Sequence, residues 1–297
     1  MTSADIASTS VPATPDLPKP ISLWRRLRAH RLFMTGAVII SIMVLLAIFA
    51  DLIQLLPPEK MQFRARFKTP DFPYPLGTDN YGRDIWSRLV HGARLSLAIG
   101  FAVALLTGVL GTLIGVLAGY FRALDGPLMR LMDALMAFPA ILLAIAIAAA
   151  LGPSAVNAVI ALAAVYTPRT ARIVRSTVLV IREMDYVQAA RACGAKHFWI
   201  IRHHILPNSM APLLVQLTFI FAYAILAEAI LSFLGVGPPP PTPTWGNMIA
   251  EGKEYLREAP HLCLFPGMAV ALVCLGLNLL GDGLRDVLDP RLRVQIG

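Results

Sequence analysis

The side chains that could perform chemistry are few in this 297-residue chain, and they stand apart from one another. Its three cysteines, Cys193, Cys263 and Cys274, form no C-x-x-C pair, and none stands near a His with metal-ligand spacing. No lysine lies in a G-x-x-x-x-G-K-[ST] loop, which would cradle the phosphates of ATP, and neither H-E-x-x-H nor G-x-S-x-G occurs. The sequence therefore predicts neither a catalytic site nor a metal site, and any ATP would be hydrolysed by a partner protein.

One acidic side chain, Glu228, interrupts an otherwise uncharged stretch at residues 211–236. It lies eight residues before the end of the stretch, which at 1.5 Å per residue is about 12 Å inside the boundary. Because an ionised carboxylate is costly to bury in an apolar layer, such a residue indicates a functional or structural contact. Two roles stay open: a hydrogen bond or ion pair between helices, and a polar point on a translocation path.

A more polar segment, residues 183–208, precedes that stretch. Asp185 is placed to cap a short helix, with Gln188 three residues later reaching back to the backbone of the cap. Gly194 is placed where a residue in the left-handed conformation would end the helix. The pattern predicts a first short helix with a defined start and a defined end.

The rest of the segment predicts a second helix and a narrow surface. Ala189 and Ala190 keep the first helix slim, and the second helix would stop at Pro207. The product is a helix-turn-helix thin enough to enter a cleft on another protein. An ordinary amphipathic connection between two helices is the alternative.

Long uncharged runs separate the charged segments of the chain. Apolar residues make up 57% of the sequence and charged residues only 15%, whereas a soluble domain carries about 25% charged residues. A membrane-spanning helix needs about 20 predominantly apolar residues. The stretches that we expect to span are residues 32–53, 95–120, 134–151, 155–173, 211–236 and 260–281. The sequence therefore predicts an all-α integral membrane protein with six transmembrane helices.

The distribution of basic residues predicts the orientation, because lysine and arginine accumulate on the cytoplasmic side of a membrane. Most of them fall on the inner segments if both termini lie in the cytoplasm. The expected organisation is a cytoplasmic tail at 1–31, a first transmembrane helix with an extracytoplasmic loop at 32–94, a transmembrane core at 95–283 and a cytoplasmic tail at 284–297.

Small residues line one face of the second predicted span. Gly111, Gly115 and Gly119 recur at intervals of four, which lets two helix backbones approach closely. The spacing predicts a close helix contact, either within this chain or with a second membrane subunit.

The segment at 183–208 resembles the E-A-A-x(3)-G-x(9)-I-x-L-P signature of the permease subunits of ABC importers. The residues that match at the expected spacing are Ala189, Ala190, Gly194, Leu206 and Pro207. Gln188 departs from the signature, where Glu is usual, and so does His204, where an aliphatic residue is usual.

Further stretches resemble the C-type permeases of dipeptide, oligopeptide and nickel importers. They are LGTDNYGRD at 76–84, LSFLGVG at 231–237 and NLLGDGLRD at 278–286. Because several independent motifs occur in the family's order, from about residue 22 to 293, the chain is identified as a member of this family with the type I ABC importer permease fold.

The resemblance implies a subunit of the bacterial cytoplasmic (inner) membrane that moves peptides by alternating access. The implied partners are a homologous second permease, two ATPase subunits and an extracytoplasmic substrate-binding protein, with membrane lipid around them and no nucleic acid. ATP and magnesium would be bound by the ATPase subunits, and this chain would hold no cofactor. The residues expected to couple it to the ATPases are Asp185, Gln188, Ala189, Ala190, Gly194, Leu206 and Pro207.

The sequence leaves three alternative functions open. Nickel or another small solute is the alternative substrate within the family. A secondary transporter would show an internal repeat with polar breaks at matching depths. A membrane-embedded enzyme would need a cluster of titratable groups at one depth, where the sequence offers Glu228 almost alone.

Overall fold

The computed structural model describes residues 23–288, and within these it contains helices and isolated bridges but no β-strand. Residues 1–22 and 289–297, which are parts of the predicted tails at 1–31 and 284–297, lie outside the described residues. The helices are α1 (Leu23–Ala29), α2 (Arg31–Ile48), α3 (Ala50–Ile53), α4 (Ile85–Tyr120), α5 (Arg122–Met136), α6 (Ala140–Leu151), α7 (Ala155–Ile181), α8 (Asp185–Ala192), α9 (His197–Ile200), α10 (Leu206–Phe233), α11 (Trp245–Gly252) and α12 (His261–Leu288). Short 3-10 helices lie at Phe63–Ala65 and Lys253–Tyr255, and a π-helical turn lies at Ile201–Ile205.

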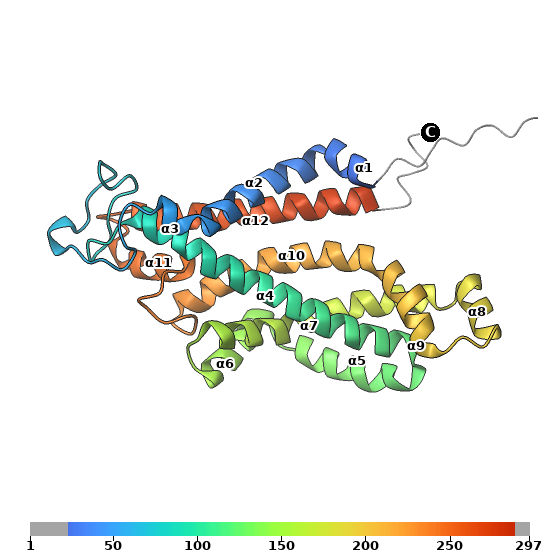
Figure 1. The fold of residues 1–297 in the computed structure, drawn as a ribbon. Coiled ribbons are helices and arrows are strands. Elements are labelled where there is room, and N and C mark those ends of the chain that lie inside the picture. The colour runs from blue at the N-terminus through green and yellow to red at the C-terminus, as the bar shows by residue number, and fades with distance from the viewer. Residues whose placement is uncertain (1–22, 289–297) are drawn as a thin grey trace, which may run out of the picture.

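The long helices form an elongated bundle (Figure 1). Helix α2 packs along α12, α4 packs along α7, and α10 contacts α4, α7 and α12. Helices α1, α8 and α9 and the last turns of α12 lie at one end of the bundle, which we call the α8 end (Figure 1). The opposite end, the α11 end, carries α11 and the long loop at residues 54–84 (Figure 1).

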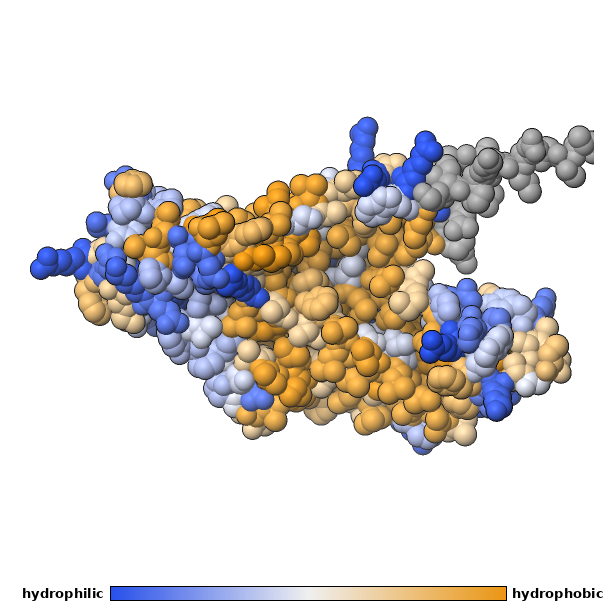
Figure 2. Space-filling view, in the orientation of Figure 1, coloured by the Kyte–Doolittle hydropathy of each residue, from blue (hydrophilic) through white to orange (hydrophobic). Residues whose placement is uncertain are grey.

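Apolar side chains cover the middle of the bundle, and hydrophilic side chains gather at its two ends (Figure 2). Within residues 23–288, four continuous helical stretches are long and apolar enough to cross a membrane, namely α2, α4, the run His197–Phe233 that contains α9 and α10, and α12. A helix with an apolar surface all round belongs in a membrane or in a core. The described residues thus confirm the all-α membrane fold class.

The prediction of a single third span at 134–151 is wrong. The chain forms α5 and α6 there, and the two helices meet at an angle of 90°. Pro139 disfavours a helical conformation at the residue before it and cannot donate a backbone hydrogen bond. At 12 residues, or about 18 Å, α6 is too short to cross a hydrocarbon core of about 30 Å alone. The bent pair can form one broken span.

Three helices extend beyond their predicted bounds. Helix α4 begins ten residues before residue 95, because the Asp84 side chain accepts a hydrogen bond of 3.0 Å from the Ser87 backbone N–H and caps it. Helix α7 continues past residue 173 and through Arg175 to Ile181. Helix α12 likewise runs past residue 283 to Leu288. The count of six spans is compatible with these helices and stays a prediction.

The glycine face of α4 is filled by α7 of the same chain. A Cβ atom added to Gly115 would lie 2.7 Å from both the Ala171 carbonyl oxygen and the Val174 Cβ, and one added to Gly119 would lie 2.7 Å from the Val178 Cβ. Such distances leave no room for a methyl group. Of the two predicted roles for these glycines, the structure therefore supports packing within the chain.

Candidate functional site

The segment at 183–208 begins with a short helix, α8, that ends at Gly194, as the sequence predicts. Gly194 has φ +80°, the left-handed conformation that glycine adopts without strain. Its N–H bonds to the Arg191 carbonyl at 2.9 Å, and the Ala195 N–H bonds to the Ala190 carbonyl at 3.0 Å. These two bonds form a Schellman motif that ends α8 and turns the chain toward α9.

The predicted capping box at the start of α8 is wrong. Met184 occupies the cap position without a side-chain hydrogen bond, and Asp185 is the first helical residue. Gln188 does not accept a bond from the cap backbone. Its side-chain amide instead donates to the Arg182 carbonyl oxygen at 3.0 Å, which lies at the end of α7. Gln188 therefore ties α8 back to the membrane helix.

Pro207 does not stop the second helix, contrary to the prediction. It stands in the first turn of α10, and the run His197–Phe233 is continuous. A proline lacks the N–H for an i→i−4 bond and its ring crowds the carbonyl four residues earlier. The chain accommodates it through the π-helical turn, in which the Leu206 N–H bonds to the Ile201 carbonyl. The segment is consequently one piece with the long helix α10.

Buried side chains fix the segment to the bundle. Val187, Ile200 and Ile205 are each fully buried in a cluster that includes Val116 of α4 and Val178 of α7. A fully buried aliphatic side chain contributes about 1.5–3 kcal/mol relative to an exposed one. The helix pair is therefore held firmly on its inner side.

Polar contacts add to this attachment. The Tyr120 hydroxyl and the His197 Nδ1 lie 3.0 Å apart, and the Arg191 guanidinium lies over the Tyr120 ring at 5.0 Å. The Arg182 guanidinium donates to the Gly119 carbonyl oxygen at 2.6 Å. A hollow of about 500 Å³ opens between these residues and Gln188. The sequence analysis missed the Tyr120–His197 contact because its members are 77 residues apart.

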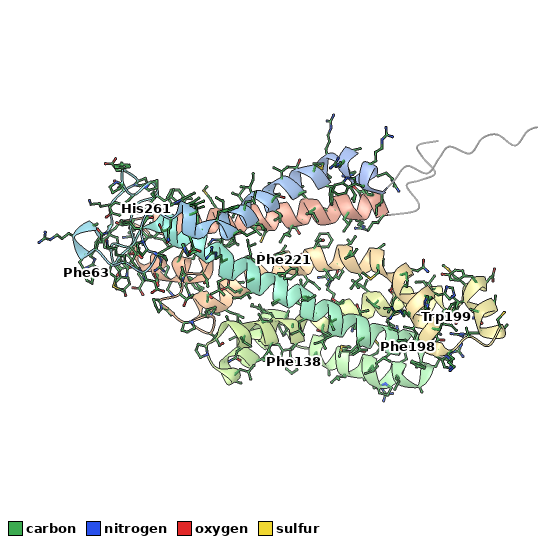
Figure 3. All side chains as sticks on the ribbon, viewed as in Figure 1. Phe63, Phe138, Phe198, Trp199, Phe221 and His261 are labelled. Carbon is green, nitrogen blue, oxygen red and sulfur yellow. The ribbon has the colours of Figure 1, made fainter. Side chains whose placement is uncertain are left out.

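The outer side of the segment is exposed at the tip of the α8 end. Phe198 is 75% exposed and Trp199 45% exposed, and both belong to α9 (Figure 3). Ala189 and Pro207 are also exposed, whereas Ala190 packs partly against the buried cluster. The two alanines thus face different ways, because neighbouring residues of a helix are about 100° apart.

The predicted coupling residues fall into two groups. Asp185, Gln188, Ala189, Gly194 and Pro207 are exposed to a partner, and Ala190 and Leu206 are half-buried against the bundle. The two half-buried residues help attach the segment to the bundle, and the five exposed ones form its outer surface. The role of all seven in coupling stays a prediction.

Glu228 lies at the other end of α10, and its side chain is fully buried. Its Oε1 accepts a hydrogen bond of 2.7 Å from the Ser232 hydroxyl, and its Oε2 accepts one of 3.3 Å from the Ser96 hydroxyl of α4. The same Ser96 oxygen accepts from the Trp245 backbone N–H of α11 at 3.3 Å. Glu228 therefore links α10, α4 and α11, and it meets protein rather than lipid in this arrangement.

We expect Glu228→Gln to assemble normally and Glu228→Leu to be destabilised. The amide keeps one acceptor oxygen, and the facing serine hydroxyls rotate to accept from its NH₂ group. Leucine leaves buried hydroxyls without a partner, at a cost of about 1–3 kcal/mol each. Thermal unfolding of the purified complex compares the two variants. If the Gln variant assembles and hydrolyses ATP but loses uptake, Glu228 serves the translocation path as well as the packing.

A buried ion cluster at the α11 end escaped the sequence analysis. The Arg83 Nε donates to the Asp79 Oδ2 at 2.6 Å, and both Arg83 and Arg88 donate to Glu251. Arg83 and Arg88 are only 2% and 1% exposed. Breaking one side of such a buried group costs several kcal/mol. The cluster fixes the long loop to α11. Because Arg88 and Glu251 are 163 positions apart in the sequence, no local pattern indicated that they pair.

Comparison with known proteins gives a family for this arrangement. The model of the binding-protein-dependent transport system inner membrane component matches residues 111–294. The chain belongs to this family. The model of the N-terminal TM domain of oligopeptide transport permease C also matches, at residues 22–70. The chain is thus an ABC importer permease, a multi-pass component of the inner membrane that works with binding-protein and ATPase partners.

Relatives of this permease are similar over nearly their whole length. A protein of Brucella abortus named as a peptide transport system permease is 53% identical over 293 residues, covering 98% of this chain and 99% of the relative. The dipeptide transport system permease protein of Alkalihalophilus pseudofirmus is 45% identical, with 92% and 91% covered. A glutathione transport system permease protein of Escherichia coli is 41% identical, with 91% and 90% covered.

Proposed function

We propose that this chain is the membrane-spanning subunit of an ATP-driven importer of short peptides. The relatives named above are described as permeases for peptides, a dipeptide and glutathione, which is itself a short peptide. The chain itself performs no catalysis, and ATP with magnesium binds to the partner ATPases. A homologous second permease completes the membrane part of the assembly.

The exposed helix pair at 183–208 transmits the movement of the ATPases. The observation that carries this proposal is the contrast between its two sides. The inner side is buried through Val187, Ile200 and Ile205, and the outer side exposes Phe198 and Trp199. A push on a rigidly attached element moves the helices to which it is fixed, and continuity with α10 carries that movement toward the α11 end. The segment therefore acts as a lever between the ATPases and the transport path.

The orientation follows from this role. We place the α8 end and both termini in the cytoplasm, on the side of the ATPases. The basic side chains at this end, among them Arg182, Arg191, Lys196 and Arg202, agree with the preference of lysine and arginine for that side. The long loop and α11 then face the binding protein.

The test is uptake by the complete transporter in liposomes that contain ATP, with the binding protein outside. We expect radiolabelled alanyl-alanine to accumulate only when the ATPase subunits can hydrolyse ATP. The control is the same assembly with ATPase subunits that bind but do not hydrolyse ATP. Equal uptake by the two assemblies would contradict an ATP-driven mechanism, and uptake of glycine betaine but of no peptide would contradict the substrate class.

A further inference from the structure

Three arginines follow one another along α7, and their surroundings differ. Arg175 donates to the Asp125 carboxylate at 2.6 Å, and Arg172 forms an ion pair with Asp133, both acids belonging to α5. Arg169 is exposed and makes no hydrogen bond or ion pair with any side chain in the part of the chain that the structure describes. Its charge is thus left available to something outside this chain.

Arg169 lies near the middle of the membrane. Its neighbour Thr170 packs against Gly111 of α4, where an added Cβ would meet the Thr170 Cβ at 2.6 Å. Gly111 lies ten residues before the end of the uncharged run at 95–121, or about 15 Å at 1.5 Å per residue. This distance is half of a hydrocarbon core of about 30 Å. An arginine at such a depth faces a bundle interior or a water-filled cavity rather than lipid.

One tyrosine lies beside Arg169. Tyr166 is one helical turn before Arg169 on α7, since residues three apart are neighbours on a helix. Tyr166 is half-buried in this chain, and Arg169 is exposed. A guanidinium with five N–H donors beside a phenol hydroxyl is suited to bind a carboxylate.

We propose that Arg169, together with Tyr166, binds the carboxylate of the transported peptide halfway across the membrane. This inference rests on the proposed function, because every linear peptide with a free C-terminus carries such a group. A carboxylate that leaves water for a low-dielectric passage loses its hydration, and a fixed guanidinium replaces part of it. Arg169 would then lower the barrier to the passage of an anionic group.

The first experiment asks whether position 169 is in water. Arg169→Cys is made in the complete transporter, with Cys193, Cys263 and Cys274 replaced by alanine, and is treated with a charged thiol reagent. We expect labelling that slows when the peptide-loaded binding protein and ATP are added. Thr170→Cys, next to it but fully buried against α4, is the matched control and stays unlabelled. If Arg169→Cys also stays unlabelled, the residue faces lipid or a subunit interface and the proposal is wrong.

The second experiment asks whether the charge acts on the substrate. We expect Arg169→Gln to lower the maximal rate of alanyl-alanine uptake about tenfold, the effect of losing one charge-assisted hydrogen bond, while the transporter still assembles. Arg169→Lys should retain most of the rate. A reagent that attaches an ammonium group to Arg169→Cys should restore uptake, and one that attaches a neutral group of similar size should not.

Specific outcomes separate this proposal from its alternatives. Alanyl-alanine amide lacks the C-terminal carboxylate, so we expect its uptake to be the same with and without Arg169→Gln. If the unchanged transporter does not carry the amide, the deciding experiment is the comparison of the two thiol reagents on Arg169→Cys. If the Arg169→Gln variant fails to assemble, the Arg169 guanidinium pairs with an acidic residue of another subunit or with a lipid phosphate. That result would overturn the proposal. If the unchanged transporter carries no peptide, the proposed function fails, whereas the labelling of position 169 still reports whether this side chain faces water.

Discussion

Replacement of Gly194 by valine is expected to uncouple the permease from its ATPases. Gly194 has φ +80°, and a β-branched residue is strained there by about 1–3 kcal/mol. No atom of the residues that the structure describes lies within 4 Å of a Cβ added at this position, so we attribute the effect to the backbone conformation. The strain opens the two hydrogen bonds that join α8 to α9 and shifts the exposed helix α8. We expect substrate-stimulated ATP hydrolysis to fall roughly tenfold.

Gly194→Asn is the matched control, because asparagine adopts the left-handed conformation more readily than valine does. It should retain most of the stimulation and the full complement of ATPase subunits after purification. Both variants are compared by subunit stoichiometry and by ATP hydrolysis with and without the peptide-loaded binding protein. If the valine variant keeps the stimulation of the unchanged protein, the segment at 183–208 is an ordinary surface connection.

Gly115→Ala is expected to destabilise the whole bundle. The added methyl would lie 2.7 Å from the Ala171 carbonyl oxygen and from the Val174 Cβ, and helix backbone cannot yield as the end of a flexible side chain can. Helices α4 and α7 must move apart, and overpacking of this kind costs about 1–3 kcal/mol or more. Thermal unfolding of the purified complex in detergent should shift to lower temperature by several degrees.

The control for this variant is Gly267→Ala. Gly267 is also inside a long helix, α12, and no atom lies within 4 Å of the Cβ that would be added. Since alanine has the higher helix propensity, this change should leave the unfolding temperature unchanged or raise it slightly. Equal shifts for the two variants would show that the α4–α7 contact does not limit stability.

The sequence by itself determined the features that depend on neighbouring residues. Long uncharged runs indicate membrane helices because hydrocarbon offers backbone groups no partner outside their own helix. The left-handed position of Gly194 was likewise readable from local pattern. The motifs around these positions also predicted the family, which the comparisons confirm.

Only the tertiary structure decided how distant segments use these features. Gln188 donates to Arg182 instead of accepting a bond from its own cap, because the chain folds back between α7 and α8. Glu228 finds its second hydrogen-bond donor in Ser96, 132 residues away in sequence. Arg169 differs from Arg172 and Arg175 only because α5 places acids beside those two and none beside the first. A pairing between remote residues depends on the packing of whole helices, and local sequence pattern carries no record of it.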